Sequence, residues 1–102
     1  MNGRYVLAPE AAFDLVKIWR YIKKHSSIEM ADHVEAVIRE KLIFLAAKPN
    51  AGHKRANLTD QPVKFFAVYS YLIVYRQDTK PLQIVSILHG RRDVEQMLKA
   101  RL

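Results

Sequence analysis

The residues with the clearest capacity for chemistry form a basic set in the second half of the chain. Lys64 and Arg76 are expected on neighbouring strands, and His89, Arg91 and Arg92 follow where the last predicted strand ends. Cations at the end and on one face of a sheet can bind anionic groups, and an imidazole can transfer a proton. These five residues therefore predict a binding surface for an anionic partner.

A smaller subset of the same residues supports a different interpretation. A ribonuclease needs a base for the 2′-hydroxyl, a clamp for the scissile phosphate and an acid close together. His89 with Arg76 and Arg91 supplies part of that set, but no glutamate or second histidine is obviously placed to complete it. Structural roles also stay open, because the stems of Lys64 and Arg76 can cover apolar surface, and Asp93 is better explained as a helix cap than as an acid.

Other catalytic and metal-binding chemistries find little support. The chain has no cysteine, which excludes disulfides, thiol nucleophiles and cysteine-ligated zinc. Its histidines lack the spacing of metal ligands, its serines lack a G-x-S-x-G elbow, and its glycines are too scattered for a phosphate-cradling loop. Tyr69, Tyr71 and Tyr75 fit either base stacking or the core, and the core is the better interpretation. We therefore expect no metal and no cofactor.

The composition indicates a single domain with an anionic partner. A length of 102 residues is common for one domain, so residues 1–102 are expected to form one domain. Seventeen Lys and Arg against ten Asp and Glu give a formal net charge of +7, which favours nucleic acid, a ribosome or an acidic protein as partner. No apolar run has the length of a membrane span, and the first residues form no signal-peptide core. We expect a soluble, cytoplasmic protein with no membrane partner.

The elements that must position the basic set begin with an amphipathic helix. Pro9 fits the first turn of this helix, which is expected to run to about Lys24. Glu10 and Asp14 complement the positive helix start. Its apolar residues recur at spacings of three and four: Ala11, Leu15, Ile18, Trp19 and Ile22. This spacing places Trp19 in the core.

A second amphipathic helix follows the break at residues 25–27. Ser26 and Glu29 match a capping box, in which each side chain bonds the backbone N–H of the other residue. The apolar stripe of this helix comprises Ala31, Val34, Ile38, Leu42 and Leu45. Because so short a break joins the two helices, we expect an antiparallel helical hairpin.

Strands and a short tail helix complete the predicted fold. The strands are expected at residues 4–7, 63–68, 71–76 and 82–89. Asp93 and Gln96 resemble an N-cap pair that opens the tail helix. The order β-α-α-β-β-β with a C-terminal helix predicts an α+β fold, in which the helical hairpin packs on a mostly antiparallel sheet. The last two strands are apolar on both faces, so the tail helix or another chain is expected to cover the second face, and a mixture of the two is favoured.

Four motifs run along nearly the whole chain. They are Tyr5-x-Leu7-x-Pro9-Glu10-Ala11-Ala12-x-Asp14-Leu15-x-x-Ile18-Trp19-x-Tyr21, Leu45-Ala46-x-x-Pro49-x-x-Gly52, Tyr71-x-Ile73-Val74-Tyr75-Arg76 and Ile84-x-x-Ile87-Leu88-His89-Gly90-x-Arg92-Asp93. Together they resemble the ParE-type toxins of the RelE/ParE superfamily, also called plasmid stabilisation system proteins. The His-Gly-Arg-Arg-Asp segment after a strand is the most specific part of the resemblance.

The resemblance implies a small α+β toxin of a type II toxin–antitoxin system, encoded with a neutralising antitoxin. ParE relatives inhibit DNA gyrase, whereas RelE relatives cut messenger RNA inside the ribosome. We expect a non-enzymatic gyrase inhibitor that binds through Lys64, Arg76, His89, Arg91 and Arg92. The alternative is a RelE-like ribosome-dependent endoribonuclease that uses His89, Arg76 and Arg91. The excess positive charge predicts an acidic, partly disordered antitoxin, with direct nucleic-acid binding as a secondary property.

Overall fold

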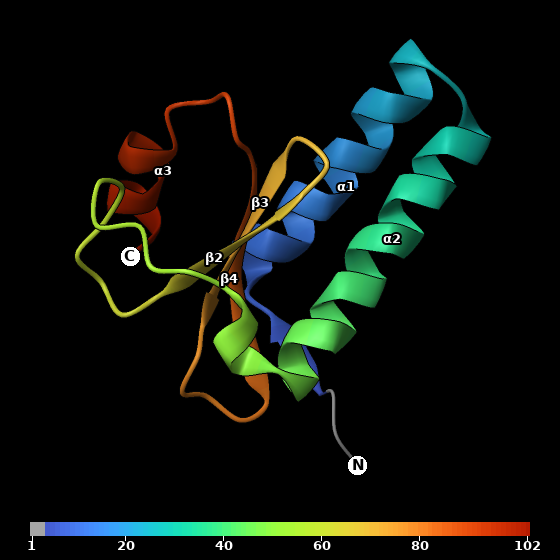
Figure 1. Ribbon diagram of the computed structural model, residues 1–102. Helices are drawn as coiled ribbons and strands as arrows, with labels where there is room; N and C mark the ends of the chain where they lie inside the picture. Colours follow the sequence, from blue (N-terminus) through green and yellow to red (C-terminus); the bar gives the residue numbers. More distant parts are fainter. Residues whose placement is uncertain (1–3) are drawn as a thin grey trace.

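The helical hairpin, the sheet and the C-terminal helix lie in successive layers (Figure 1). This computed structural model describes residues 4–102. Along the chain the elements are β1 (Tyr5–Leu7), α1 (Pro9–His25), α2 (Ile28–Ala47), the single turn η1 (Pro49–Ala51), β2 (Lys64–Val68), β3 (Tyr71–Arg76), β4 (Leu82–His89) and α3 (Val94–Arg101). The predicted α+β order is confirmed.

The sheet has the strand order β1-β4-β3-β2. β2, β3 and β4 pair antiparallel in sequence order, whereas the short β1 pairs parallel with β4 at the edge, with Tyr5 opposite Leu82. The register of β3 and β4 shifts between Val74 and Tyr75, which places a bulge in the centre of the sheet. The first and last strands of the chain are therefore neighbours.

The α1–α2 hairpin covers one face of the sheet with the predicted apolar stripes. Leu15, Ile38, Leu42 and Leu45 are buried there against residues of β3 and β4 such as Ile73. Burying one such side chain contributes about 1.5–3 kcal/mol. The apolar spacing of three and four residues in the sequence therefore identifies the helical side of the main core.

Ser27, rather than the predicted Ser26–Glu29 pair, caps α2. The Ser27 hydroxyl accepts the backbone N–H of Met30 at 3.0 Å, and Ser27 has extended φ and ψ angles as an N-cap requires. Ser26 instead ends α1, because its backbone N–H donates to the carbonyl of Ile22 at 2.8 Å. The predicted capping box was wrong by one residue, since both serines are chemically able to cap.

Trp19 lies at the seam between the two helices rather than in the core. It is half-buried and stands outside the main apolar cluster, whereas its neighbours Ile18 and Ile22 pack against that cluster. The indole N–H donates to the Asp32 carboxylate at 2.8 Å, and the Lys23 ammonium lies 5.4 Å from the indole ring centre. The core prediction for Trp19 was wrong, because the core side of α1 is turned toward the two isoleucines.

The side chain of Tyr75 stabilises the Pro-x-x-Gly turn that follows α2. Its buried hydroxyl donates to the Pro49 carbonyl and accepts the Gly52 N–H, both at 2.8 Å. A Cβ added to Gly52 would come within 2.9 Å of the Phe65 carbonyl oxygen, so the turn requires glycine. Burial raises the pKa of Tyr75, although the bond from the Gly52 N–H opposes that rise. The core interpretation of Tyr75 is confirmed.

The tail helix α3 covers the second face of the sheet. Val94 and Leu98 of α3 are buried with Phe65, Val74 and Leu88 in a smaller apolar cluster. The predicted cap is confirmed, because the Asp93 carboxylate accepts the backbone N–H of Gln96 at 3.1 Å. The tail therefore provides the cover that the two-sided apolar strands require.

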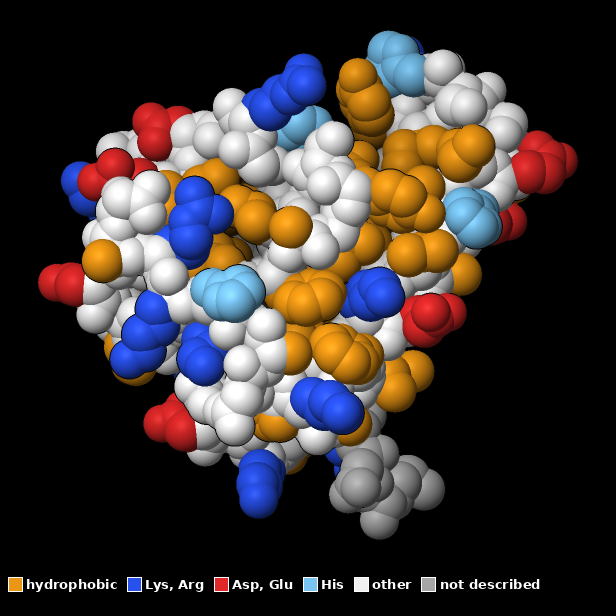
Figure 2. All heavy atoms as spheres, in the orientation of Figure 1, with side chains coloured by type: hydrophobic (Ala, Val, Ile, Leu, Met, Phe, Trp, Pro, Cys, Tyr) orange, Lys and Arg blue, Asp and Glu red, His pale blue; other side chains and the backbone are white. Residues whose placement is uncertain are grey.

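An apolar surface remains uncovered where α2 passes the edge strand β2. Met30, Val37 and Phe44 recur every seven residues of α2, and the ring of Phe44 lies 5.8 Å from that of Phe66 on β2. At the end of β2, Tyr69 is 61% exposed. Figure 2 shows hydrophobic side chains gathered on this face of the molecule. We call these five residues the α2–β2 apolar surface.

Candidate functional site

The structure divides the predicted basic set between the two ends of the sheet. His89 pairs with Tyr71 at one end of β3, whereas Arg76 ends the same strand. The five steps from Tyr71 to Arg76 span about 16 Å at the usual rise of a strand. Lys64 pairs with Tyr75 and therefore lies toward the Arg76 end. The histidine and two arginines considered for a ribonuclease are not brought together.

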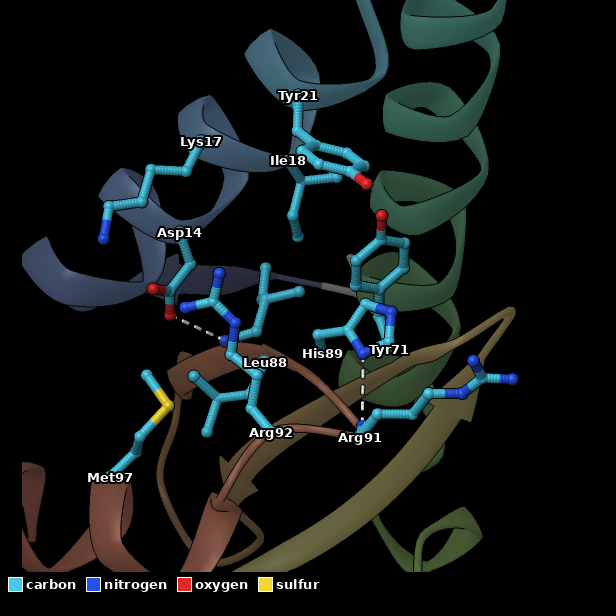
Figure 3. Close-up of a pocket in the computed structure, with 11 residues that line it drawn as sticks. Asp14, Lys17, Ile18, Tyr21, Tyr71, Leu88, His89, Arg91, Arg92 and Met97 are labelled. Atoms are coloured by element: carbon cyan, nitrogen blue, oxygen red, sulfur yellow. Dashed lines mark hydrogen bonds between the residues drawn. The ribbon is translucent and has the colours of Figure 1, made fainter. Parts of the chain in front are cut away.

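The other three members of the set meet at a cleft. A cavity of about 340 Å³ opens between α1 and the end of β4, and His89, Arg91 and Arg92 line it (Figure 3). Neither Lys64 nor Arg76 lines this cavity. The segment that follows β4 is therefore the centre of the candidate site.

One stripe of α1 forms the opposite wall of the cleft. Asp14, Lys17, Ile18 and Tyr21 all line it, and their spacing of three, four and seven residues places them on one helix face. Ile18 packs against the main core, which fixes the rotation of α1. The same helix packing that builds the core therefore turns Tyr21 toward the cleft, whereas the Lys17 ammonium lies 4.8 Å from the centre of the Phe13 ring, which does not line it.

The aromatic end of the cleft is built from directly opposed strand residues. Tyr71 and His89 face each other across the ladder, with ring centres 5.5 Å apart in an edge-to-face arrangement of 82°. His89 Nδ1 accepts the backbone N–H of Arg91 at 3.1 Å, so the neutral imidazole carries its proton on Nε2. Burial raises the pKa of Tyr71, and the nearby Tyr21 raises it further. Tyr71 therefore remains a neutral hydroxyl at physiological pH.

Arg91 and Arg92 are both exposed and extend to opposite sides of the cleft. Figure 3 shows the Arg92 guanidinium turned toward Asp14 and α1, whereas Arg91 extends away beyond His89. The chain turns between them, because the Arg92 N–H donates to the His89 carbonyl at 3.0 Å. Consecutive arginines on a turn thus place one cation at each end of the same cleft.

A buried ion pair lies at the base of the cleft. The Asp14 carboxylate accepts two bonds from the Arg101 guanidinium, at 2.5 and 3.0 Å, and a third from the Ile87 N–H at 3.0 Å. Arg101 also donates to the Ser86 hydroxyl at 3.0 Å. The bonds to Asp14 raise the pKa of Arg101, against the opposing effect of burial. Because Arg101 balances Asp14, the remaining charges around the cleft are positive.

The comparison with family models identifies the chain. The model described as "ParE toxin of type II toxin-antitoxin system, parDE" matches residues 5–94, which include both walls of the cleft. The chain belongs to the ParE toxin family. The predicted family is thereby confirmed.

A solved structure shows the same fold as this ParE-family toxin. It is described as "Chromosomal ParDE TA system from P. aeruginosa", and it matches with a TM-score of 0.71 and 22% sequence identity. The alignment covers 84% of this chain and 94% of that chain. At this level of identity the likeness concerns the fold. No curated protein sequence is significantly similar to the chain.

The described part of the toxin shows neither a metal site nor a membrane-spanning helix. Within residues 4–102, no three His, Cys, Asp or Glu side chains gather where they could hold a metal ion. No helix in the same range combines the length and apolar character needed to cross a bilayer.

Sequence reasoning missed half of the cleft in this toxin. It assigned Asp14 to the helix start, but Asp14 is 5% exposed and binds Arg101 near the other end of the chain. The available signal was an acidic residue inside the apolar stripe of α1. Tyr71 was placed in the core, and it lies instead between the core and the cleft. Lys17 and Tyr21 were not singled out, although their i,i+4 spacing puts them on one face.

Proposed function

We propose that this ParE-family toxin inhibits DNA gyrase by binding to it. The observation that supports the proposal is the cationic cleft at the end of β4, which His89, Arg91 and Arg92 line. Arginine side chains form strong charge-assisted hydrogen bonds to carboxylates, so this surface suits an acidic region of a protein partner. Gyrase acts on chromosomal DNA, and the proposal therefore places the toxin in the cytoplasm.

The proposed binding surface extends from the cleft along the sheet. Arg91 and Arg92 make the principal contacts, and the Nε2–H of His89 donates a hydrogen bond without transferring a proton. Arg76 at the far end of β3, and Lys64 on the neighbouring β2, provide the outer part of the surface. The net charge of +7 accelerates encounter with an acidic partner.

We place the antitoxin on the α2–β2 apolar surface. Phe44 is 39% exposed and Tyr69 is 61% exposed, so a partner segment can bury both without rearranging the core. An acidic, amphipathic segment that is disordered alone would cover these residues and neutralise nearby cations. This assignment leaves the cleft and the antitoxin surface on different parts of the toxin.

The decisive experiment compares two activities of the purified toxin. Gyrase supercoiling and DNA cleavage are measured beside ribosome-dependent cleavage of messenger RNA. We expect gyrase inhibition by the wild type, weakened by Arg91→Ala or Arg92→Ala, and unchanged by His89→Gln, which keeps a hydrogen-bond donor. A ribonuclease that used His89 as acid or base would instead lose about 10²–10⁴ in rate with His89→Gln.

Matched controls keep this test specific. Arg55→Ala removes an exposed arginine of the loop before β2 and is expected to leave toxicity unchanged. All variants are compared by growth arrest at equal expression, and circular dichroism verifies folding. Loss of toxicity in a folded His89→Gln protein, with messages cut by the wild type, would overturn the gyrase proposal in favour of the ribonuclease.

The antitoxin assignment has a separate test. Coexpression with the product of the adjacent small open reading frame is expected to raise the yield of the toxin and to relieve growth arrest. Phe44→Glu should abolish that protection, whereas Phe13→Glu, at an exposed phenylalanine of α1, should retain it. A neighbouring product that neither binds nor protects would contradict the assignment.

A further inference from the structure

The two-residue turn that joins β2 to β3 holds a tyrosine in a strained backbone conformation. Among residues 4–102, Tyr69 is the one non-glycine residue with a positive φ angle, at 55°. Bulky side chains rarely adopt this region, and hairpin turns favour glycine, asparagine or aspartate where it is required. Residues held in such conformations concentrate at functional sites. Tyrosine is therefore less favourable for the fold than glycine would be at the same position.

The fold gains little from the Tyr69 side chain. It is 61% exposed and belongs to neither apolar cluster, so the core interpretation of this tyrosine is wrong. Its hydroxyl lies 3.5 Å from Nε2 of His33 on α2, at the outer limit of a hydrogen bond, and both side chains are exposed. A partner that binds the ring would explain a side chain that strains the backbone and stays in solvent.

The turn is attached to the segment that carries the basic residues of the cleft. The Gly90 N–H donates to the Ser70 carbonyl at 2.7 Å, and a Cβ added to Gly90 would come within 3.3 Å of that oxygen. Arg91 follows Gly90 and extends away from Arg92 and α1 (Figure 3). Tyr69 and Arg91 are therefore each next to one member of this hydrogen-bonded pair, and one partner segment can contact both.

We propose that Tyr69 is a target-binding residue, and that the antitoxin neutralises the toxin by covering it. This inference rests on the proposed function, because the target is the gyrase that binds at the cleft. Arg91 pairs with a carboxylate of the target, and the Tyr69 ring packs against an apolar side chain beside that carboxylate. Tyrosine and arginine are, with tryptophan, the residues that most often dominate the binding energy of a protein interface.

The α2–β2 apolar surface leads to the same tyrosine. The rings of Phe44 and Phe66, 5.8 Å apart, form one end of it, and Tyr69 opposite His33 forms the other. The stretch of α2 from His33 to Phe44 spans about 17 Å at the usual helical rise. An antitoxin segment that lies along this surface therefore ends on Tyr69, beside the cleft. The antitoxin surface and the target surface meet there.

Tyr69→Gly separates binding from folding. Glycine accepts the positive φ angle, so the melting temperature should stay the same or rise by up to about 8 °C. Binding to gyrase should nevertheless weaken by about 10- to 30-fold, because the ring is lost. Tyr69→Phe keeps the ring and should retain most of the affinity. A Tyr69→Gly toxin that binds gyrase as tightly as the wild type, or that melts at a lower temperature because the fold needs the ring, would overturn the proposal.

The same variants are measured for binding to the antitoxin, with the product of the adjacent small open reading frame as the probe. Tyr69→Gly should weaken the binding of both partners, whereas Phe44→Glu should weaken only that of the antitoxin and Arg92→Ala only that of gyrase. Phe13→Ala removes a phenylalanine of α1 that is 55% exposed and should change neither. Loss of antitoxin binding alone in Tyr69→Gly would contradict the shared role of this residue.

A competition assay completes the test. Wild-type toxin is bound to immobilised gyrase, and the antitoxin is added at increasing concentration. We expect the antitoxin to displace the toxin from gyrase, and a stable complex of all three proteins would show separate surfaces and overturn the inference. If Arg92→Ala weakens gyrase binding and Tyr69→Gly does not, the proposed function stands and this inference alone fails. A wild-type toxin that does not bind gyrase would overturn both.

Discussion

The two faces of the sheet are stabilised in different ways. On one face, two long helices bury a continuous apolar core, and Ile38, Leu42 and Ile73 are fully buried in it. On the other face, the eight-residue α3 contributes Val94 and Leu98 to a smaller cluster. The helical hairpin is therefore held on the first face by the apolar area that it buries. The shorter α3 buries less, so it needs a further interaction to hold it on the second face.

Arg101 supplies that attachment through its ion pair with Asp14. The two side chains are 14% and 6% exposed, so both charges are largely desolvated. Such a pair adds little net stability compared with apolar residues, but removing one partner leaves the other charged and unpaired. Because Asp14 and Met97 of α3 both border the cleft, the attachment of the tail also shapes the candidate site.

The largest effect should come from breaking this ion pair. Asp14→Ala leaves the Arg101 guanidinium and the Ile87 N–H without their acceptor, which should lower the free energy of unfolding by about 3–5 kcal/mol. Urea titration measures the loss, and hydrogen exchange should show that α3 opens first. The double variant Asp14→Ala/Arg101→Leu removes the unpaired charge and should recover much of the stability. A loss below about 1 kcal/mol would show that the tail does not need the pair.

A pair of leucine truncations compares the two faces directly. Leu42 and Leu98 are 0% and 1% exposed, on the first and second face respectively. Leu42→Ala should lower the free energy of global unfolding by about 2–5 kcal/mol. Leu98→Ala should mainly accelerate hydrogen exchange in α3 while α1 and α2 stay protected. If Leu98→Ala accelerated hydrogen exchange equally in α3 and in α1 and α2, the two faces would not differ in how they are stabilised.

The helices on the first face were largely predictable from the sequence, because the patterns that specify a helix involve residues close to one another in the chain. The spacing of Ala31, Val34, Ile38, Leu42 and Leu45 reports the buried side of α2 directly. The cap at Asp93 was also predictable, because a cap involves residues three apart. Ser27 was missed because two adjacent serines offer the same chemistry, and only the path of the chain selects one of them.

The candidate site was predictable only where its residues are neighbours in sequence. His89, Arg91 and Arg92 were found together because they follow one strand. Arg101 and Asp14 are 87 residues apart, and no periodicity links positions at that separation. The separation of Arg76 from His89 did not need the structure, since an antiparallel hairpin places the end of one strand beside the start of the next.

A smaller effect on the first face should follow from removing one hydroxyl. Tyr75→Phe leaves the Gly52 N–H and the Pro49 carbonyl without their buried partner, which should cost about 1–3 kcal/mol. Thermal unfolding measures the loss, and hydrogen exchange in α3 should be unaffected below the transition. Tyr21→Phe, at an exposed tyrosine, is the matched control and should change stability little. Faster exchange confined to α3 would mean that the two faces are not independent.

The smallest effect should arise at Trp19, on the edge of the first face. The indole N–H bond to Asp32 lies at an exposed position, where one hydrogen bond contributes about 0.5–1.5 kcal/mol. Trp19→Phe keeps an aromatic ring over the seam and should therefore cost about 1 kcal/mol in urea unfolding.

The partner variant makes the cause of that small loss measurable. Asp32→Ala removes the same hydrogen bond from the α2 side, and its loss should be similar to that of Trp19→Phe. Because both variants break one interaction, the double variant should be little worse than either single variant. A loss of about 3–5 kcal/mol for Trp19→Phe alone would instead mean that the ring carries core packing. The buried core beneath the helical hairpin would then extend into the seam between α1 and α2, as far as Asp32.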